Sequence, residues 1–252
     1  MNYYVDMHSN ILPGIAGLEN RALTETEAEQ RLAVFRQSNV KLAVAAPYYR
    51  PDVWDAKSFL NLRDEKITEA EQLTAARAAT EPSSQPLRIV SGAVLPLDYC
   101  LQYPRTIEQF TLGETEYFLI NLPRVEITED FCESLSRLRI VSGLYPVAVD
   151  IDRFFDIWSP EEWIALRQTG MLLQISVNGL LEQKYRKLSL FLLANRHAHF
   201  IATGSRQIDE PLRFADAMRI VQRSLPAQLY RRIKNNPGML LSNAEPSAFY
   251  EA

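Results

Sequence analysis

The sequence predicts an α/β protein in which parallel strands and crossover helices form one barrel-like domain over residues 1–252. Short apolar runs alternate with helical patterns along the whole chain. The runs show little polar alternation, which is typical of strands covered on both faces. The only linker-like stretch, residues 80–86, is too short to separate two domains. A doubly wound sheet is the alternative, and both architectures place functional residues at the carboxyl ends of the strands.

The predicted strands are rich in Val, Ile, Leu, Phe, Tyr or Ala. They are Tyr3–His8, Val40–Ala46, Leu87–Leu95, Tyr117–Leu122, Gly143–Val149, Met171–Val177 and His199–Thr203.

Several predicted helices have recognisable ends. Thr24 and Glu27 form a capping box that begins one helix, and Asn39 is suited to end it. Ser159-Pro160 begins another, which Gly170 ends. Further helices are predicted over Ser58–Ala79, Leu180–Asn195, Pro211–Ser224 and Pro226–Asn235.

Composition excludes several classes of function. A formal net charge of −4 and a pI near 5.5 argue against nucleic-acid binding through phosphate contacts. No apolar run approaches the ~18–20 residues of a membrane span, and the first residues lack signal-peptide features, so we expect a cytoplasmic protein. Cys100 and Cys132 are isolated, and the chain has only three histidines. These numbers exclude a cysteine zinc cluster and leave little material for a histidine-rich metal centre.

Polar residues follow each predicted strand, and closure of the strands would bring them to one basin. They include His8, Asn10, Tyr48, Tyr49, Arg50, Asn121, Arg124, Asp150, Asp152, Arg153, Asn178, Ser205 and Arg206. In contrast, His197 and His199 lie at the amino end of their strand, where we expect structural roles.

Three segments carry a family resemblance. Residues 6–14, Asp-Met-His-Ser-Asn-Ile-Leu-Pro-Gly, are similar to Asp-x-His-Ser-His-Ile-Leu-Pro-Gly. Residues 146–154 are similar to Pro-Val-Ile-Ala-His-Pro-Glu-Arg-Tyr, and residues 199–206 to His-Phe-Ile-Ala-Ser-Asp-Ala-His. The chain thus resembles the manganese-dependent bacterial tyrosine phosphatases of the polymerase-and-histidinol-phosphatase (PHP) superfamily, found with capsule and exopolysaccharide genes. The resemblance runs to about Glu245 and implies a distorted TIM-like (β/α)7 barrel.

The resemblance also implies a cluster of manganese or other divalent ions held at the strand ends. Of the ligand positions only His8 is unchanged, and the degenerate positions are Asn10, Tyr48, Tyr49, Val94, Asn121, Asp150, Gly204 and Arg206. Val94 and Asn121 replace two bridging glutamates, which leaves the repulsion between cations uncompensated. We therefore expect no metal cofactor and no metal-dependent catalysis.

The arginines suggest a binding role instead. If Arg50, Arg124, Arg153 and Arg206 converge, their guanidinium groups would bind a phosphate or another small anion directly. Arg153 corresponds to a family arginine that resembles a phosphate contact. The alternative is that these arginines pair with neighbouring acids.

The leading hypothesis is a catalytically inactive homologue that binds a small anion or a phosphorylated protein tail and acts in the regulation of exopolysaccharide synthesis. The first alternative is an active protein-tyrosine phosphatase or phosphoesterase with an altered, single-metal site built on His8, Asp150 and Arg153. The second alternative is a scaffold whose basin is plugged by Tyr48, Tyr49 and Arg206.

Overall fold

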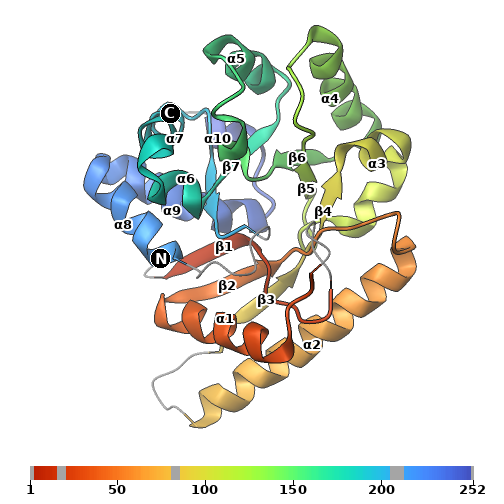
Figure 1. Ribbon diagram of the computed structural model, residues 1–252, viewed down its shortest axis with the longest axis vertical. Helices are drawn as coiled ribbons and strands as arrows, with labels where there is room; N and C mark the ends of the chain where they lie inside the picture. Colours follow the sequence, from red (N-terminus) through yellow and green to blue (C-terminus); the bar gives the residue numbers. More distant parts are fainter. Residues whose placement is uncertain (1–2, 16–20, 81–85, 205–212, 251–252) are drawn as a thin grey trace.

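Parallel strands form the centre of the molecule and helices surround them (Figure 1). The computed structural model describes residues 3–15, 21–80, 86–204 and 213–250. Within these residues the strands form two sheets, and every strand pair is parallel. In order, the first sheet holds β1 (Tyr4–Ser9), β2 (Val40–Ala45) and β3 (Arg88–Ser91), and the second holds β4 (Val94–Pro96), β5 (Tyr117–Asn121), β6 (Tyr145–Ala148), β7 (Leu172–Ser176) and β8 (Phe200–Ala202).

The two sheets of the described chain meet at isolated parallel bridges. Ser9 in β1 pairs with Gly204 just after β8, and Tyr48 just after β2 pairs with Val94 in β4. The predicted strand Leu87–Leu95 is present as β3 and β4, which pair with different sheets. The parallel α/β fold is thus confirmed, while closure into a (β/α)7 barrel and a single domain over residues 1–252 stay predictions.

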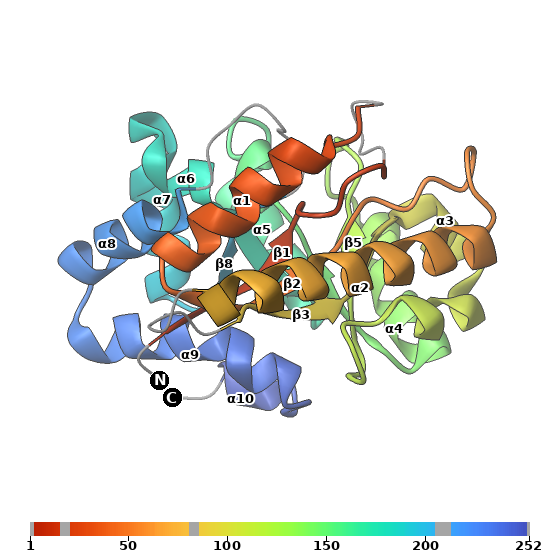
Figure 2. The same ribbon diagram turned by 90° about the horizontal axis from the view of Figure 1, so that it is seen from below.

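Helices cover the outside of the strands. They are α1 (Glu25–Gln37), α2 (Ala56–Thr80), α3 (Leu97–Gln102), α4 (Glu129–Ser142), α5 (Pro160–Gln168), α6 (Val177–Leu181), α7 (Gln183–Ala194), α8 (Phe214–Ser224), α9 (Ala227–Leu241) and α10 (Ser247–Tyr250), with 3-10 turns η1 (Pro104–Phe110) and η2 (Ile151–Phe154). Figure 2 shows α1 and α2 together over the first sheet, and an ion pair of 2.7 Å joins Arg77 of α2 to Glu29 of α1. None of the helices in the described ranges is long and apolar enough to cross a membrane.

The predicted helix ends at Thr24 and Ser159 are confirmed. The Thr24 hydroxyl accepts a hydrogen bond from the Glu27 backbone N–H, and Glu27 accepts one from the Thr24 backbone N–H. Ser159 forms the same capping box with Glu162. Each box satisfies amides that a helix start leaves without intrahelical partners.

Some helices differ from the sequence predictions. Helix α4 was not predicted, although Thr128 caps its start and Gly143 ends it in the left-handed conformation. The predicted helix Leu180–Asn195 is interrupted at Glu182, whose extended backbone separates α6 from α7. Residues 211 and 212 of the predicted helix Pro211–Ser224 lie outside the described residues, and α8 begins at Phe214.

Alternate side chains of the strands pack into different parts of the core. Leu119 of β5 joins an inner cluster with Met7, Val147 and Phe200, enclosed by the strands. Its neighbours Phe118 and Ile120 belong to the outer cluster beneath the helices. The period of two in strand side chains therefore buries both faces of the sheets, as the apolar runs predict.

Candidate functional site at the strand ends

A buried polar cluster lies where the strands end, with His8 of β1 at its centre. The His8 side chain is fully buried, and its Nδ1 lies 3.2 Å from Oε1 of Gln174 and 3.7 Å from Oδ1 of Asp150. Gln174 Oε1 also accepts a hydrogen bond of 3.1 Å from the Asp150 backbone N–H. Since this oxygen only accepts, His8 Nδ1 is the donor, and Gln174 orients the imidazole ring.

The Asp150 carboxylate is held from three sides. The Tyr48 hydroxyl donates to Oδ2 at 3.3 Å, and Nε2 of Gln174 donates to Oδ1 at 3.4 Å. On the third side is Gly204, where an added Cβ would lie only 2.9 Å from Asp150 Oδ1. Protein groups therefore surround this carboxylate closely.

Two further buried carboxylates connect neighbouring strand ends. Asp6 accepts hydrogen bonds from the Thr203 hydroxyl at 2.6 Å and from the His8 backbone N–H at 3.2 Å. Asp152 accepts from the Ser176 backbone N–H and hydroxyl at 2.7 and 2.8 Å. Burial raises the pKa of Asp6 to about 7 and that of Asp152 to about 6, because desolvation disfavours the charged form.

The adjacent tyrosines point to different places. Tyr48 packs in the inner cluster and reaches Asp150. Tyr49 packs in the outer core against Phe59 and Phe110, with ring centroids 5.0 and 4.9 Å away, and burial raises its pKa to about 12. Of the predicted plug, Tyr48 thus lies at the cluster, Tyr49 is directed away from it, and Arg206 falls outside the described residues.

The remaining degenerate positions offer few ligands. Val94 is fully buried in the inner cluster and carries no donor atom. Asn10 is buried, and its backbone carbonyl accepts a hydrogen bond of 3.1 Å from Arg31. Asn121 ends β5, and its buried Oδ1 has no hydrogen-bond partner among the described residues. Only the amide of Asn121 therefore retains unused polar capacity at these three positions.

The described arginines have different surroundings. Arg153 donates to the Leu122 carbonyl and stacks over the Phe154 ring at 4.4 Å. Arg124 is exposed two residues after Leu122, on the same loop as the carbonyl that Arg153 contacts. Arg50 forms an ion pair of 2.6 Å with Asp52, as the alternative of pairing with neighbouring acids expects. Arg206 is outside the described residues, so the convergence of all four stays a prediction.

The donor atoms present do not fit a multi-metal centre. Among the described residues, no group of three or more His, Cys, Asp or Glu side chains is arranged to hold a metal ion. The nearest approach is that of His8 to Asp150, and protein hydrogen bonds already engage both side chains. A two-metal hydrolytic mechanism needs several such ligands around each ion, so we derive no catalytic step through a metal.

The other histidines lie away from this cluster. His199 precedes β8, and its Nδ1 accepts a hydrogen bond of 3.0 Å from the Leu173 backbone N–H. Burial lowers the pKa of His199 to about 3, so the ring is neutral. His197 is half-buried beside Phe191. The structural role expected for His199 agrees with these contacts.

Sequence reasoning did not select Gln174 as a site residue. It is fully buried in the middle of β7, between Leu173 and Ile175. A lone amide within an apolar strand was the available signal, because burying it without hydrogen bonds would be costly. Its three contacts to His8 and Asp150 explain its presence.

Parallel strands with helical crossovers and a polar cluster at the strand ends define a class of α/β proteins whose functional residues lie at that edge. The chain belongs to the capsular polysaccharide synthesis CpsB/CapC family, whose sequence model matches residues 4–242.

Solved structures agree with this fold. The crystal structures described as YwqE from Bacillus subtilis and CpsB from Streptococcus pneumoniae, unique metal-dependent tyrosine phosphatases, are matched with a TM-score of 0.76 and 18% identity, over 96% of this chain and 95% of that chain. The phosphotriesterase homology protein from Escherichia coli, complexed with phosphate, has a TM-score of 0.52 and 11% identity, over 94% and 98% of the two chains. No curated protein matches the sequence.

Proposed function

We propose that this chain is a non-catalytic relative of the metal-dependent tyrosine phosphatases, and that its strand-end basin binds an anion such as the phosphate of a phosphorylated tyrosine. The observation that carries the proposal is the internal hydrogen bonding of the cluster. Tyr48 and Gln174 donate to the Asp150 carboxylate, and Gln174 also accepts from His8. Side chains tied to protein partners in this way are poorly placed to replace the hydration shell of a metal ion.

Arginine supports the binding part of the proposal. Arg153 is oriented by the Leu122 carbonyl and the Phe154 ring, and Arg124 follows on the same loop. A guanidinium group carries a permanent charge and binds phosphate oxygens in fork geometry, so cations of the protein would take over the role of cations from solution. With the family's description as capsular polysaccharide synthesis proteins, we propose a regulatory role in exopolysaccharide production.

Peptide binding tests this role. We expect a fluorescent phosphotyrosine peptide to bind, with at least tenfold weaker binding to the unphosphorylated peptide. Arg153→Ala should weaken the phosphopeptide at least tenfold. Arg88→Ala is the matched control, because Arg88 is exposed at the opposite, amino-terminal end of β3. Equal binding of the two peptides, or equal effects of the two substitutions, would contradict the proposed pocket.

A single-metal phosphatase is the second candidate, favoured by the 3.7 Å approach of His8 Nδ1 to Asp150 Oδ1. Turnover of p-nitrophenyl phosphate with and without added manganese separates the two functions. The non-catalytic proposal expects no difference from the buffer blank. Manganese-dependent turnover that disappears in His8→Ala would establish the second candidate instead.

A further inference from the structure

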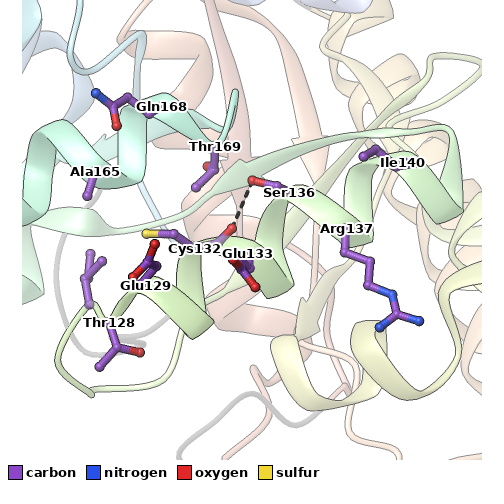
Figure 3. A pocket seen from close by; sticks show the side chains of 11 residues that line it. Thr128, Glu129, Cys132, Glu133, Ser136, Arg137, Ile140, Ala165, Gln168 and Thr169 are labelled. Carbon is purple, nitrogen blue, oxygen red and sulfur yellow. Dashed lines mark hydrogen bonds between the residues drawn. The ribbon is translucent and has the colours of Figure 1, made fainter.

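An open groove separates α4 from α5 on the outer helical layer (Figure 3). Its volume is about 560 Å³, and its lining includes Cys132, Ser136 and Ile140 from α4 and Ala165 from α5. A second hollow of about 570 Å³ shares Ser136 and Ile140 and extends the groove to Tyr145. None of the strand-end cluster residues lines either hollow.

Large apolar side chains are exposed at both ends of α4. Ile140 is 80% exposed and Val141 is 44% exposed near the carboxyl end, and Val125 is 44% exposed just before the amino end. Ile164 of α5, across the groove, is 51% exposed. Apolar side chains gathered on one surface are typical of a protein–protein interface.

The charges of α4 change sign along the helix. Glu129 and Glu133 lie in the amino-terminal half, and Arg137 and Arg139 lie in the carboxyl-terminal half. Glu133 and Arg137 have the spacing of an intrahelical ion pair. The described residues nevertheless include no acid paired with Arg137, and Figure 3 shows its side chain directed away from Glu133. Both charges are thus available to a second molecule.

We propose that α4 is the centre of a two-fold interface between two copies of this chain. In an antiparallel pair whose axis crosses α4 at the level of Leu135, Glu133 of each copy faces Arg137 of the other. Ile140 lies five residues from Leu135, a rise of about 7.5 Å, so it reaches the level of Asp130 on the opposing helix. There the half-buried Cys132 and Ala165 form an apolar part of the groove.

A second copy fits this surface because α4 is its own complement. A helix that is acidic in one half and basic in the other meets opposite charges when it is paired with itself in antiparallel orientation. The same two-fold operation brings the apolar carboxyl end, with Ile140, to the amino end near Val125 of the other copy. An unrelated partner would need to reproduce both patterns.

Charge exchange tests the interface in the full chain. Sedimentation velocity from 5 to 500 µM should show a monomer–dimer equilibrium with a Kd of about 10–100 µM, because one helix pair gives an interface at the small end of specific complexes. Glu133→Arg alone, or Arg137→Glu alone, creates two like-charge contacts per dimer and should raise Kd at least tenfold. The double exchange of both residues restores opposite charges and should return Kd to within about threefold of the original.

Apolar variants provide a second readout. Ile140→Ser should also raise Kd at least tenfold, whereas Phe191→Ser on α7, which removes a side chain that is 55% exposed elsewhere, should not. Circular dichroism and Tm verify that each variant is folded. A monomer at 500 µM, or a dimer that the single charge exchanges leave unchanged, would overturn the proposal.

Discussion

At the scale of single residues, Gly204 brings the end of β8 into contact with the Asp150 carboxylate. Gly204 and Gly143 have nearly the same backbone, with φ of +75° and +70°, so an alanine meets a similar conformational strain at either position. A Cβ on Gly143 would contact nothing within 4 Å, whereas a Cβ on Gly204 would lie 2.9 Å from Asp150 Oδ1. The two glycines therefore separate backbone strain from close packing.

We expect Gly143→Ala to lower the free energy of unfolding by about 1 kcal/mol, the usual cost of the left-handed conformation for a residue with Cβ. Gly204→Ala should lose about 1–3 kcal/mol more, because the surroundings of Asp150 must move. Urea denaturation of both variants measures the difference. Equal losses would show that the approach of Gly204 to Asp150 has no energetic importance.

The residue contacts of the site were only partly predictable. The opening motif identified His8, and position after a strand identified Asp150. The opposite directions of Tyr48 and Tyr49 were not predictable, because they depend on the bridge from Tyr48 to Val94, a contact between segments distant in sequence. The role of Gln174 likewise depends on contacts with residues more than twenty positions away.

At the scale of elements, the start of α1 shows how local signals define a helix. Thr24→Ala removes the hydroxyl that accepts from the Glu27 backbone N–H at 3.2 Å. The free energy of unfolding should fall by about 1 kcal/mol, the usual contribution of an N-cap. Thr68→Ala is the matched control, because Thr68 is an exposed threonine in α2. This variant should be neutral or gain about 0.5 kcal/mol, since alanine has the higher helix propensity. Urea denaturation decides, and equal effects at the two sites would contradict the capping role of Thr24.

The elements themselves were easier to predict than the site. Each predicted strand is present because an apolar run covered on both faces is a strong local signal. Helix α4 was missed because only Leu135 and Leu138 of its side chains are buried, while Ile140 and Val141 are exposed and obscure the helical period. The exposed residues that blurred the sequence pattern are those of the proposed interface.

At the scale of the whole molecule, buried ionisable groups connect distant parts of the fold and make stability depend on pH. Asp6 joins β1 to the segment after β8, and Asp152 joins η2 to the end of β7. Their pKa values are raised, so between about pH 4 and 6–7 the folded state binds more protons than the unfolded state. Their contribution to stability therefore falls as pH rises through this range.

His199 has the opposite effect. Its folded pKa is about 3 and its unfolded pKa about 6.5, so the unfolded state binds the extra proton between these values and the contribution of His199 to stability rises with pH. His199→Asn keeps a hydrogen-bond acceptor near the Leu173 backbone N–H but does not titrate. Urea denaturation from pH 4 to 8, with a chelator present, should show the original chain gaining stability over this variant up to pH 6.5, by at most about 1.4 kcal/mol per pH unit, and no further gain above. Asp6→Asn should show the reverse, with the original chain losing stability relative to the variant from about pH 4 to 7. Parallel pH profiles of the original chain and both variants would contradict the assigned protonation states.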